Sequence, residues 1–292
     1  MDLDSGQIRN ALGIAVTTGN YLRQTRIGTL SSWKAAAFAK AARNAVEAAL
    51  YARNGISGPS EIIAGRHGLI SQITGGEFDL APYFGGQEGE EYKIVHTYIK
   101  YFPAEYHSQS AIWAAIDLRN RIGPDRWRDI KTVLVETSRH SYEIIGMERD
   151  KWRPGTRETA DHSLPYITAA ALMDGDITLK QFDREHLRNK ALLDLVDKVE
   201  CREKKEYTDL YGTSYPNKIT VNMDNGEVFV KEIVNPKGHP LDPLDRNQVE
   251  SKFRINAESL LDSAQQDRLI RYVWDLDNLK NLKPLMDCLV IR

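Results

Sequence analysis

The chain has 292 residues, of which 41% are hydrophobic and 27% charged, so it is long enough to bury a sizeable core and to divide into two domains. Lysine and arginine number 39 against 41 aspartates and glutamates, and the net charge of -2 leaves no basic excess for binding nucleic acid or an anionic membrane. The two cysteines, Cys201 and Cys288, lie far apart and lack metal-ligand spacing, which fits a reducing compartment and excludes a zinc or iron–sulfur site built from cysteines.

The amino-terminal part of the chain is predicted to be helical. Residues 5–51 are rich in alanine and other helix formers, with apolar residues at helical spacing. Ser31 and Ser32 are suitable N-caps within this stretch, and Asn54-Gly55 is typical of a helix end. The first residues lack a signal-peptide pattern, and no apolar run approaches the ~20 residues that span a bilayer. We therefore expect a soluble, cytoplasmic protein without a membrane partner.

A glycine-rich segment follows, in which the helical periodicity ends. Gly75-Gly76 and Gly85-Gly86 indicate a loop, because glycine pairs interrupt regular structure. We predict a domain boundary just after this loop, near residue 94.

The middle of the chain has the pattern of mixed helices and strands. Residues 131–137 (KTVLVET) predict a strand, and residues 218–234 predict a hairpin whose turn is Asp224-Asn225-Gly226, since Asn and Gly tolerate positive φ. We find no Gly-rich phosphate loop and no regular βαβ alternation. The interleaved segments predicted to be helical are 110–120, 166–174 and 186–198.

After Pro243 the sequence returns to helical patterns. Residues 247–256 and 264–274 are amphipathic, and residues 279–289 form a weaker helical pattern. Pro284 is expected to break or kink this last segment, because proline lacks a backbone donor.

These composition shifts predict an α+β fold made of two domains. Residues 1–94 and 240–292 are expected to form one mainly helical domain from both ends of the chain. Residues 95–239 are expected to form an α+β lid domain inserted between them.

Lys34 is the first candidate binding residue. It lies in the first turn of a predicted helix, where the macrodipole is positive and an anion would remove an unfavourable interaction. Ser32, two residues before it, is assigned to substrate binding. A solvated surface lysine fits the same spacing, so the pattern alone leaves both interpretations open.

A denser group of polar side chains surrounds Pro103. Lys100 could neutralise a substrate carboxylate, and Glu105 or His107 could act as general acid or base. Pro103 suits the start of a helix, which would place Glu105 and His107 in or near its first turn. The alternative is a capping loop with exposed polar groups.

Further candidates lie later in the chain. His162 and Ser163 precede an apolar helix and are assigned to substrate binding, although a histidine there often has only a structural role. Tyr142, after the strand predicted at 131–137, has the same ambiguity. Lys237 and His239 are also assigned to substrate binding, but they lie where the chain should return to the helical domain, so a hinge role competes.

The remaining histidines give weaker signals. His67 is a poor candidate, and His96, His140 and His186 are expected at the surface. No pattern resembles a serine triad, a cysteine–histidine nucleophile pair or a two-histidine zinc helix. We therefore expect no bound metal and no cofactor.

Five segments spread over the chain are specific when taken together. They are LSSWKAAAFAKAARNAVEAALYARNGISGP (30–59), GRHGL (65–69), KYFPAEYHSQSAIW (100–113), RETADHSLPYITAAALMDG (157–175) and PKGH (236–239). In these segments the chain resembles the MmgE/PrpD family, and most closely its 2-methylcitrate dehydratases.

The resemblance implies a small polycarboxylate substrate. The family includes dehydratases of methylcitrate, decarboxylases of cis-aconitate and epimerases of iminodisuccinate, so it does not determine the reaction. The motif FPAEYHSQ looks like the dehydratase branch, whereas the decarboxylase branch has a histidine in place of Glu105. Family members have a helical domain from both chain ends with an α+β lid, and they need neither metal nor iron–sulfur cluster.

The resemblance also implies site residues. The family's active-site lysines match Lys34 and Lys100, and an active-site tyrosine of the decarboxylase branch aligns with Tyr142. Glu105 occupies the position of that branch's catalytic histidine, and His107 follows it in the motif. We expect Lys34 and Lys100 to face one pocket between the domains and to bind carboxylates during elimination of water.

Family chains are longer than this one. Their amino-terminal helical stretch supplies an aspartate, a threonine and two histidines to the active site, and we expect this chain to lack it. We therefore expect little activity from the chain alone and an exposed apolar surface. A homo-oligomer (dimer), or a hetero-oligomer with a polypeptide that supplies the missing helices, would cover that surface. The alternatives are an epimerase or decarboxylase of a related polycarboxylate, or a non-catalytic scaffold or binding subunit.

Overall fold

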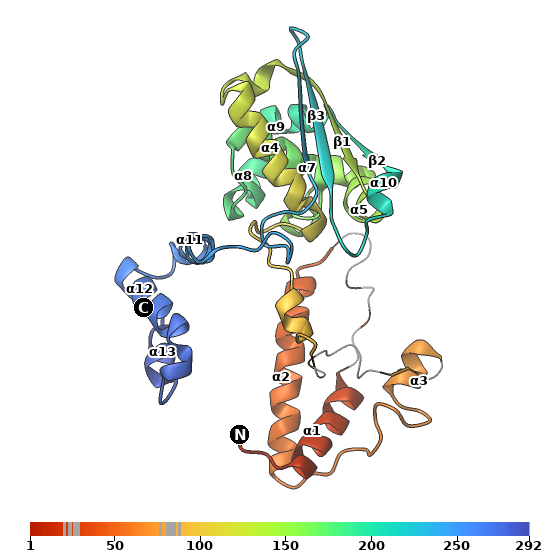
Figure 1. Ribbon diagram of the computed structural model, residues 1–292, viewed down its shortest axis with the longest axis vertical. Helices are drawn as coiled ribbons and strands as arrows, with labels where there is room; N and C mark the ends of the chain where they lie inside the picture. The colour runs from red at the N-terminus through yellow and green to blue at the C-terminus, as the bar shows by residue number, and fades with distance from the viewer. Residues whose placement is uncertain are drawn as a thin grey trace. The chain divides into compact units, whose positions relative to one another are not determined.

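Two compact units make up the chain (Figure 1). The first comprises Met1–His96 and Gly155–Thr159, and the second comprises Thr97–Pro154 and Ala160–Arg292. The computed structural model describes residues 1–19, 22, 25, 30–75, 78, 79, 86 and 89–291, so most of the predicted glycine-rich loop lies outside the described residues. That residues 1–94 and 240–292 together form one helical domain stays a prediction.

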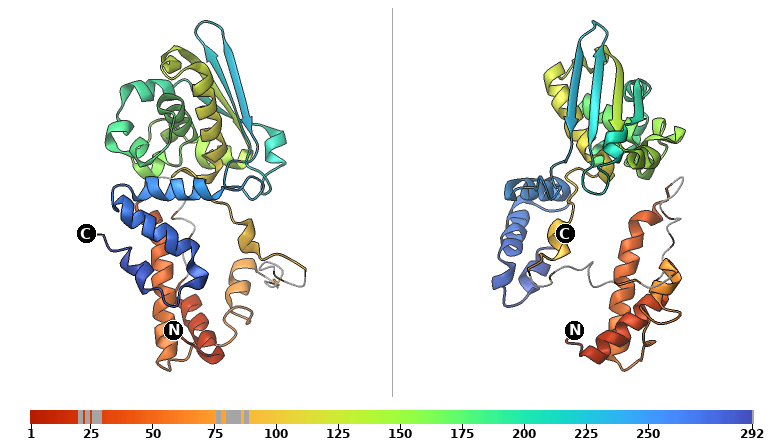
Figure 2. Two further views of the ribbon diagram at one scale, coloured as in Figure 1. Left: turned by 60° about the vertical axis from the view of Figure 1, so that its left-hand side comes forward. Right: turned by 45° about the vertical axis from the view of Figure 1, so that its right-hand side comes forward.

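The first unit contains the helices that the amino-terminal sequence predicts. They are α1 (Ser5–Thr18), α2 (Trp33–Arg53), α3 (Leu69–Thr74) and the 3-10 turn η3 (Lys93–His96). Helices α1 and α2 lie side by side in both views of Figure 2. Asp4 and Gln7 form a capping box at the start of α1, in which each side chain accepts a hydrogen bond from the other residue's backbone.

Helix α2 differs from its prediction in two respects. Ser32 occupies the N-cap, but its backbone is already helical (φ -58°, ψ -22°) and its side chain makes no capping hydrogen bond. Phe38 and Val46, from the apolar face of this helix, are 82% and 50% exposed. The apolar spacing therefore predicted the helix correctly, and the exposure of its apolar face agrees with the exposed apolar surface expected from the sequence.

A four-stranded mixed sheet forms the centre of the second unit (Figure 1). Its strands are β1 (Ile130–Thr137), β2 (Val199–Glu203), β3 (Asn217–Met223) and β4 (Val228–Ile233). The order is β2-β1-β3-β4, with β1 parallel to β2 and the other pairs antiparallel. The predicted strand and hairpin are confirmed, whereas β2 was not predicted because VECRE is short and largely polar.

One face of the sheet is apolar and the other is polar. Residues of β3 alternate between buried and partly exposed positions, so that Ile219 and Val221 point into the core. On the opposite face, Lys218 Nζ lies 2.9 Å from Glu136 Oε2 on β1. The sheet therefore has a single packed face.

The packed face is covered by α4 (Gln109–Ile122) and α7 (Leu164–Asp174), which also contact each other. Ile112, Leu118, Leu164 and Ile167 are fully buried in this core. The other helices and turns of this part are η4 (Tyr106–Ser108), η5 (Arg126–Asp129), α5 (Arg139–Ser141), η6 (Tyr142–Gly146), η7 (Arg149–Trp152), η8 (Leu179–Phe182), α8 (Arg184–Leu187), α9 (Lys190–Val196) and α10 (Lys205–Thr208). The short helix α6 (Arg157–Ala160) belongs to the first unit except for its last residue.

Two helix predictions are corrected by local capping. The single helix predicted at 186–198 is split into α8 and α9, because the Asn189 side chain accepts from the N–H groups of Ala191 and Leu192 and so begins a new helix. Pro284 lies in the first turn of α13 (Lys283–Asp287) and therefore begins that helix instead of breaking it.

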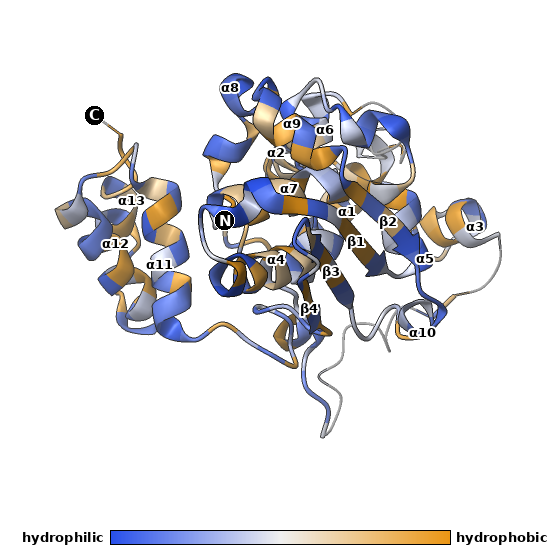
Figure 3. Cartoon of the chain, turned by 90° about the horizontal axis from the view of Figure 1, so that it is seen from above, coloured by the Kyte–Doolittle hydropathy of each residue, from blue (hydrophilic) through white to orange (hydrophobic). Residues whose placement is uncertain are grey.

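The carboxy-terminal segment is helical, as predicted. It contains α11 (Arg246–Ala257), α12 (Ser263–Trp274), η9 (Leu276–Asn278) and α13. Figure 3 shows both hydrophobic and hydrophilic residues on α11, α12 and α13. Phe253, Leu269 and Leu285 line an apolar groove of about 340 Å³ among them. Within the part of the chain that the structure describes, every helix is too short or too polar to span a lipid bilayer.

Candidate functional site

The segment before α4 is held in place by one buried amide. Gln109 Oε1 accepts hydrogen bonds from the N–H groups of Tyr101 (3.1 Å) and Phe102 (3.0 Å). Its Nε2 donates to the carbonyl groups of Phe102 (3.1 Å) and Ala104 (3.3 Å). Gln109 is fully buried, so this network fixes the backbone that leads to Glu105.

Glu105 and His107 form a hydrogen-bonded pair at the end of this segment. Glu105 Oε1 lies 2.8 Å from His107 Nδ1, and Glu105 Oε2 accepts from the His107 backbone N–H at 2.7 Å. Glu105 is therefore the N-cap of η4, and Pro103 precedes the cap instead of beginning a helix as predicted. Both side chains are mostly buried, with 14% of the glutamate and 11% of the imidazole exposed.

The charge state of this pair follows from its contacts. Burial alone would raise the pKa of Glu105, but the hydrogen bonds from His107 and the charges of His107 and His162 together hold that pKa below its ordinary value. An ionised carboxylate accepts from Nδ1–H, so Nε2 of His107 is left to exchange a proton. Nε2 is buried and has no hydrogen-bond partner among the described residues.

A second histidine–carboxylate pair adjoins the first. His162 Nδ1 is hydrogen-bonded to Asp161 Oδ1, and the Asp161 carbonyl accepts from the Glu105 backbone N–H at 2.8 Å. The charge of His162 acts on Glu105. Two imidazoles, each oriented by a neighbouring carboxylate, are thus brought together from separate segments.

The pair at Glu105 is also tied to the sheet. Asn217 Nδ2, at the start of β3, donates to the His107 carbonyl and to Ser110 Oγ, each at 2.8 Å. Ser110 Oγ in turn donates to the Tyr215 carbonyl at 2.6 Å. These bonds hold the first turn of α4 against the strand, so His107 has a fixed backbone.

Aromatic rings surround the first pair. Tyr211 stacks on His140 with ring centroids 3.8 Å apart and on His107 with centroids 5.9 Å apart. Tyr98 stacks on Tyr106 at 5.1 Å and on His239 at 4.8 Å. Tyr215 lies edge-on to Tyr98, Tyr106, His107 and Tyr211. Burial raises the pKa of Tyr106, so its phenol remains protonated.

His239 belongs to this ring cluster, but Lys237 does not. His239 is buried, and its Nδ1 accepts from the Leu241 backbone N–H at 3.1 Å, which places the ring proton on Nε2. Burial lowers the pKa of His239, so the imidazole is neutral. Lys237 Nζ pairs with Asp242 Oδ1 at 2.5 Å. The turn between them therefore sends the two predicted residues in different directions.

Lys100 has a neighbour that the sequence did not predict. It is exposed, and the Lys252 ammonium on α11 donates to its backbone carbonyl. Burial, and then the positive charge of Lys100, lower the pKa of Lys252. Among the described residues neither ammonium forms an ion pair with a carboxylate, so the positive charge of these two lysines is not neutralised there.

The remaining predicted residues have contacts of their own. Ser163 is fully buried and caps α7, since its Oγ accepts from the Tyr166 N–H at 3.1 Å and donates to the Lys151 carbonyl. Tyr142 begins η6 and packs against the core. Ser32 and Lys34 belong to the first unit, so their placement relative to Lys100 stays a prediction.

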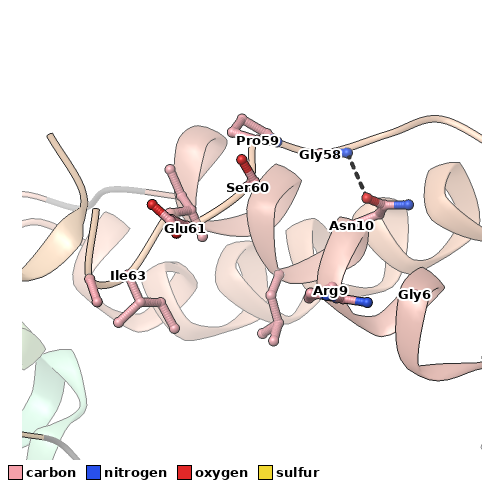
Figure 4. Close-up of a pocket in the computed structure, with 11 residues that line it drawn as sticks. Gly6, Arg9, Asn10, Gly58, Pro59, Ser60, Glu61 and Ile63 are labelled. Carbon is pink, nitrogen blue, oxygen red and sulfur yellow. Dashed lines mark hydrogen bonds between the residues drawn. The ribbon is translucent and has the colours of Figure 1, made fainter. Parts of the chain in front are cut away.

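The first unit has its own cavity, of about 720 Å³ (Figure 4). It is lined by Arg9, Asn10, Ser60 and Glu61 among others, and by none of the predicted site residues. Gly58 N donates to Asn10 Oδ1 at 3.2 Å, and a Cβ at Gly58 would lie 2.2 Å from the Asn10 carbonyl oxygen. The close approach explains why glycine occurs there.

Comparison with known proteins identifies the family. The MmgE/PrpD C-terminal domain matches residues 102–278, and the MmgE/PrpD N-terminal domain matches residues 1–81. The chain belongs to the MmgE/PrpD family. The expectation that this chain lacks the family's amino-terminal helical stretch is not borne out, because residues 1–81, which include α1 and α2, match the N-terminal domain.

Among characterised MmgE/PrpD relatives, 2-methylcitrate dehydratase from Salmonella typhimurium is 29% identical over 97% of this chain and 59% of its own length. The 2-methylcitrate dehydratase of Escherichia coli is 28% identical, with the same coverage. Cis-aconitate decarboxylase from Homo sapiens is 24% identical over 100% of this chain and 58% of its own length. The chain thus spans about three fifths of these relatives.

Several residues of this candidate site were not predicted from the sequence. Tyr211 and Tyr215 lie in YTDLYGTSYPN, where tyrosines recur every four residues within a polar turn region, and this spacing was a usable signal. Asn217 and Lys252 had no comparable signal, because they reach the site only through tertiary contacts. The described residues contain no group of three or more histidine, cysteine or acidic side chains that could hold a metal ion.

Proposed function

We propose that this protein is a hydro-lyase that eliminates water from 2-methylcitrate or a related tricarboxylate. The names of the relatives from Salmonella typhimurium and Escherichia coli support this substrate class. The observation within this chain that carries the proposal is the Glu105–His107 pair, in which a carboxylate orients an imidazole and leaves Nε2 available.

Elimination of water needs a base and an acid. The base removes a proton from the carbon next to a carboxylate, and the electron pair of that C–H bond forms the new double bond. The acid protonates the hydroxyl that leaves the adjacent carbon. We assign the base to Nε2 of His107, because Glu105 accepts from Nδ1–H and stabilises the imidazolium that forms.

His162 is the residue that we assign to the acid. Its Nδ1 is hydrogen-bonded to Asp161, which orients the imidazole, and its charge acts on the Glu105 carboxylate. The base and the acid are then two different residues. This suits an elimination in which the proton and the hydroxyl leave from adjacent carbons.

The substrate carboxylates require cations. Lys100 and Lys252 lie together without a carboxylate partner among the described residues, so one substrate carboxylate would relieve their mutual repulsion. It would also stabilise the negative charge that spreads onto that carboxylate as the proton leaves. Lys34 remains our proposed ligand for a second carboxylate.

The proposal is tested by incubating the purified protein with 2-methylcitrate and following the absorbance of the conjugated alkene. Turnover that is lost in His107→Gln supports it, and absence of both turnover and substrate binding by calorimetry contradicts it. Lys252→Met is expected to raise KM about tenfold with a smaller change in kcat, since it removes binding charge. Lys283→Met, which breaks only the surface pair with Asp287, is the matched control.

Decarboxylation of cis-aconitate is the second candidate, because cis-aconitate decarboxylases also match this chain. The decarboxylase branch of the family has a histidine at the position of Glu105, and the glutamate in this chain therefore favours dehydration. Release of carbon dioxide from cis-aconitate distinguishes the two reactions, since dehydration releases only water. Epimerisation would exchange the α proton with solvent without producing an alkene.

A further inference from the structure

The hydroxyl group of Tyr106 is buried without a hydrogen-bond partner among the described residues. Its ring is held in place, because it stacks on Tyr98 with centroids 5.1 Å apart and meets Tyr215 edge-on at 5.0 Å. Both enclosing rings are only partly buried, so the hydroxyl lies close to the surface of its unit. Since buried polar groups in proteins are normally hydrogen-bonded, the Tyr106 hydroxyl is available to a ligand.

The two enclosing tyrosines already have hydrogen-bond partners. Tyr98 Oη donates to the Gly212 carbonyl oxygen at 3.2 Å, and Tyr215 is hydrogen-bonded to Tyr98. Burial, and then the phenols of Tyr98 and Tyr215, raise the pKa of Tyr106, so its hydroxyl keeps its proton at neutral pH. Tyr106 therefore offers an uncharged donor that neither neighbouring phenol satisfies.

A second buried atom without a partner belongs to the next residue. Nε2 of His107 has no hydrogen-bond partner among the residues that the structure describes. The rings of Tyr106 and His107 both lie edge-on to Tyr215, with centroids 5.0 and 5.3 Å from it. Because Nδ1–H of His107 is directed at Glu105, the neutral imidazole presents Nε2 as an acceptor. One donor and one acceptor thus flank a single ring.

We propose that Tyr106 is a further substrate-binding residue, whose hydroxyl donates to the substrate carboxylate next to the C–H bond that His107 breaks. The inference rests on the proposed function, because that function assigns the base to His107. As Nε2 takes the proton, negative charge spreads from the carbon onto the carboxylate oxygens, and a donor already in place stabilises it. A carboxylate has about four lone-pair sites, so it can accept from Tyr106 and from a lysine ammonium together.

The conservative variant separates a ligand contact from a structural contact. Tyr106→Phe keeps the ring and removes only the oxygen, so a hydroxyl that serves a ligand is lost without loss of stability in the free protein. Tyr166 is the matched control, because its fully buried hydroxyl donates to the Gln181 carbonyl oxygen at 2.6 Å. Tyr166→Phe leaves that carbonyl without its donor and is expected to lower stability.

The experiment uses the purified full chain and two probes. Tricarballylate, a tricarboxylate without the hydroxyl that dehydration removes, reports binding by calorimetry, and 2-methylcitrate reports turnover. Tyr106→Phe is expected to raise the Kd for tricarballylate about tenfold and to lower kcat for 2-methylcitrate about 10²-fold. Its midpoint of urea unfolding is expected to stay unchanged or to rise. Tyr166→Phe is expected to lower this midpoint and to leave Kd unchanged.

The inference and the proposed function fail in different ways. Turnover with the same kcat, KM and Kd in wild type and Tyr106→Phe would overturn the inference and leave the hydro-lyase proposal in place. A Kd for tricarballylate that rises in Tyr106→Phe, without turnover by wild type, would support the contact and contradict dehydration. Equal losses of stability in Tyr106→Phe and Tyr166→Phe would overturn the inference, since the hydroxyl would then have a partner within the protein. Absence of both binding and turnover in wild type would overturn both proposals.

Discussion

The two histidine–carboxylate pairs share a local design but differ in their surroundings. In each, a carboxylate one or two residues away holds Nδ1 of the imidazole. The Glu105–His107 pair is more buried, with 14% and 11% of the side chains exposed against 26% and 17% for Asp161–His162. Only the former is shown to be tied to β3 by Asn217 and flanked by Tyr211. Each imidazole is thus oriented by a carboxylate close to it in sequence, whereas the burial of the Glu105–His107 pair comes from segments far away in sequence.

The largest expected effect separates the two pairs directly. His107→Gln should lower kcat/KM by about 10²–10⁴-fold, because it removes the proposed base while keeping a polar side chain. His162→Gln should cost less, about 10²-fold, since solvent can partly replace a more exposed acid. His186→Gln, whose imidazole lies 3.3 Å from Asp174, is the control and should have little effect. Equal losses in His107→Gln and His162→Gln would contradict the comparison.

The hydrogen bonds that join the Glu105–His107 segment to the sheet can be removed without mutating either histidine–carboxylate pair. Asn217→Ala removes two hydrogen bonds of 2.8 Å from a buried position and should lower the free energy of unfolding by about 1–3 kcal/mol. Asn222→Ala on the same strand loses a more exposed bond to Thr132 and should change it by about 0.5 kcal/mol or less. Urea denaturation measures both. Similar losses of unfolding free energy in the two variants would mean that the buried hydrogen bonds of Asn217 stabilise the protein no more than the exposed bond of Asn222.

The smallest expected effect is a pH dependence that belongs to the first pair. The folded-state pKa of Glu105 is lowered, so its carboxylate contributes stability above its ordinary pKa of 4.5, and this contribution is lost as pH falls through the folded value. The difference in unfolding free energy between wild type and Glu105→Gln should therefore shrink as pH falls below 4.5. Glu143→Gln, at the surface pair with Arg139, is the control. A difference that stays constant with pH would refute the assignment.

Much of the fold could be predicted from short-range patterns. The strand and the hairpin could be predicted because the β-branched residues of β1 and the Asp224-Asn225-Gly226 turn favour these structures by themselves. β2 could not be found in this way, because it is a strand only by pairing in parallel with β1. The exposure of Phe38 agrees with the exposed apolar surface that was expected, but spacing identifies an apolar helix face without saying what covers it.

The candidate site shows the same division. Glu105 and His107 lie in one short segment that is rich in polar side chains, and this richness allowed both residues to be predicted as site candidates. Tyr98, Tyr211 and Lys252 join the site through contacts between remote parts of the chain, and such contacts have no signature in a single sequence. Lys237 and His239 are close in sequence but have different contacts, because Lys237 pairs with Asp242 while His239 stacks on Tyr98, and their assignment to substrate binding stays a prediction.

The hydrogen bond from Asn217 to His107 also determines the order in which the protein can become active during folding. It joins residues 110 positions apart and starts from β3, which pairs with β1, so we expect it to form late in folding. Glu105 and His107 are two residues apart and can meet as soon as η4 forms, whereas closing a long loop is slow because its entropic cost precedes any gain. The chain therefore acquires its proton-transfer pair early and its enclosed, desolvated form late. If that enclosure is required for catalysis, activity should recover later in refolding than the formation of η4, and if it is dispensable, activity should recover as soon as η4 forms.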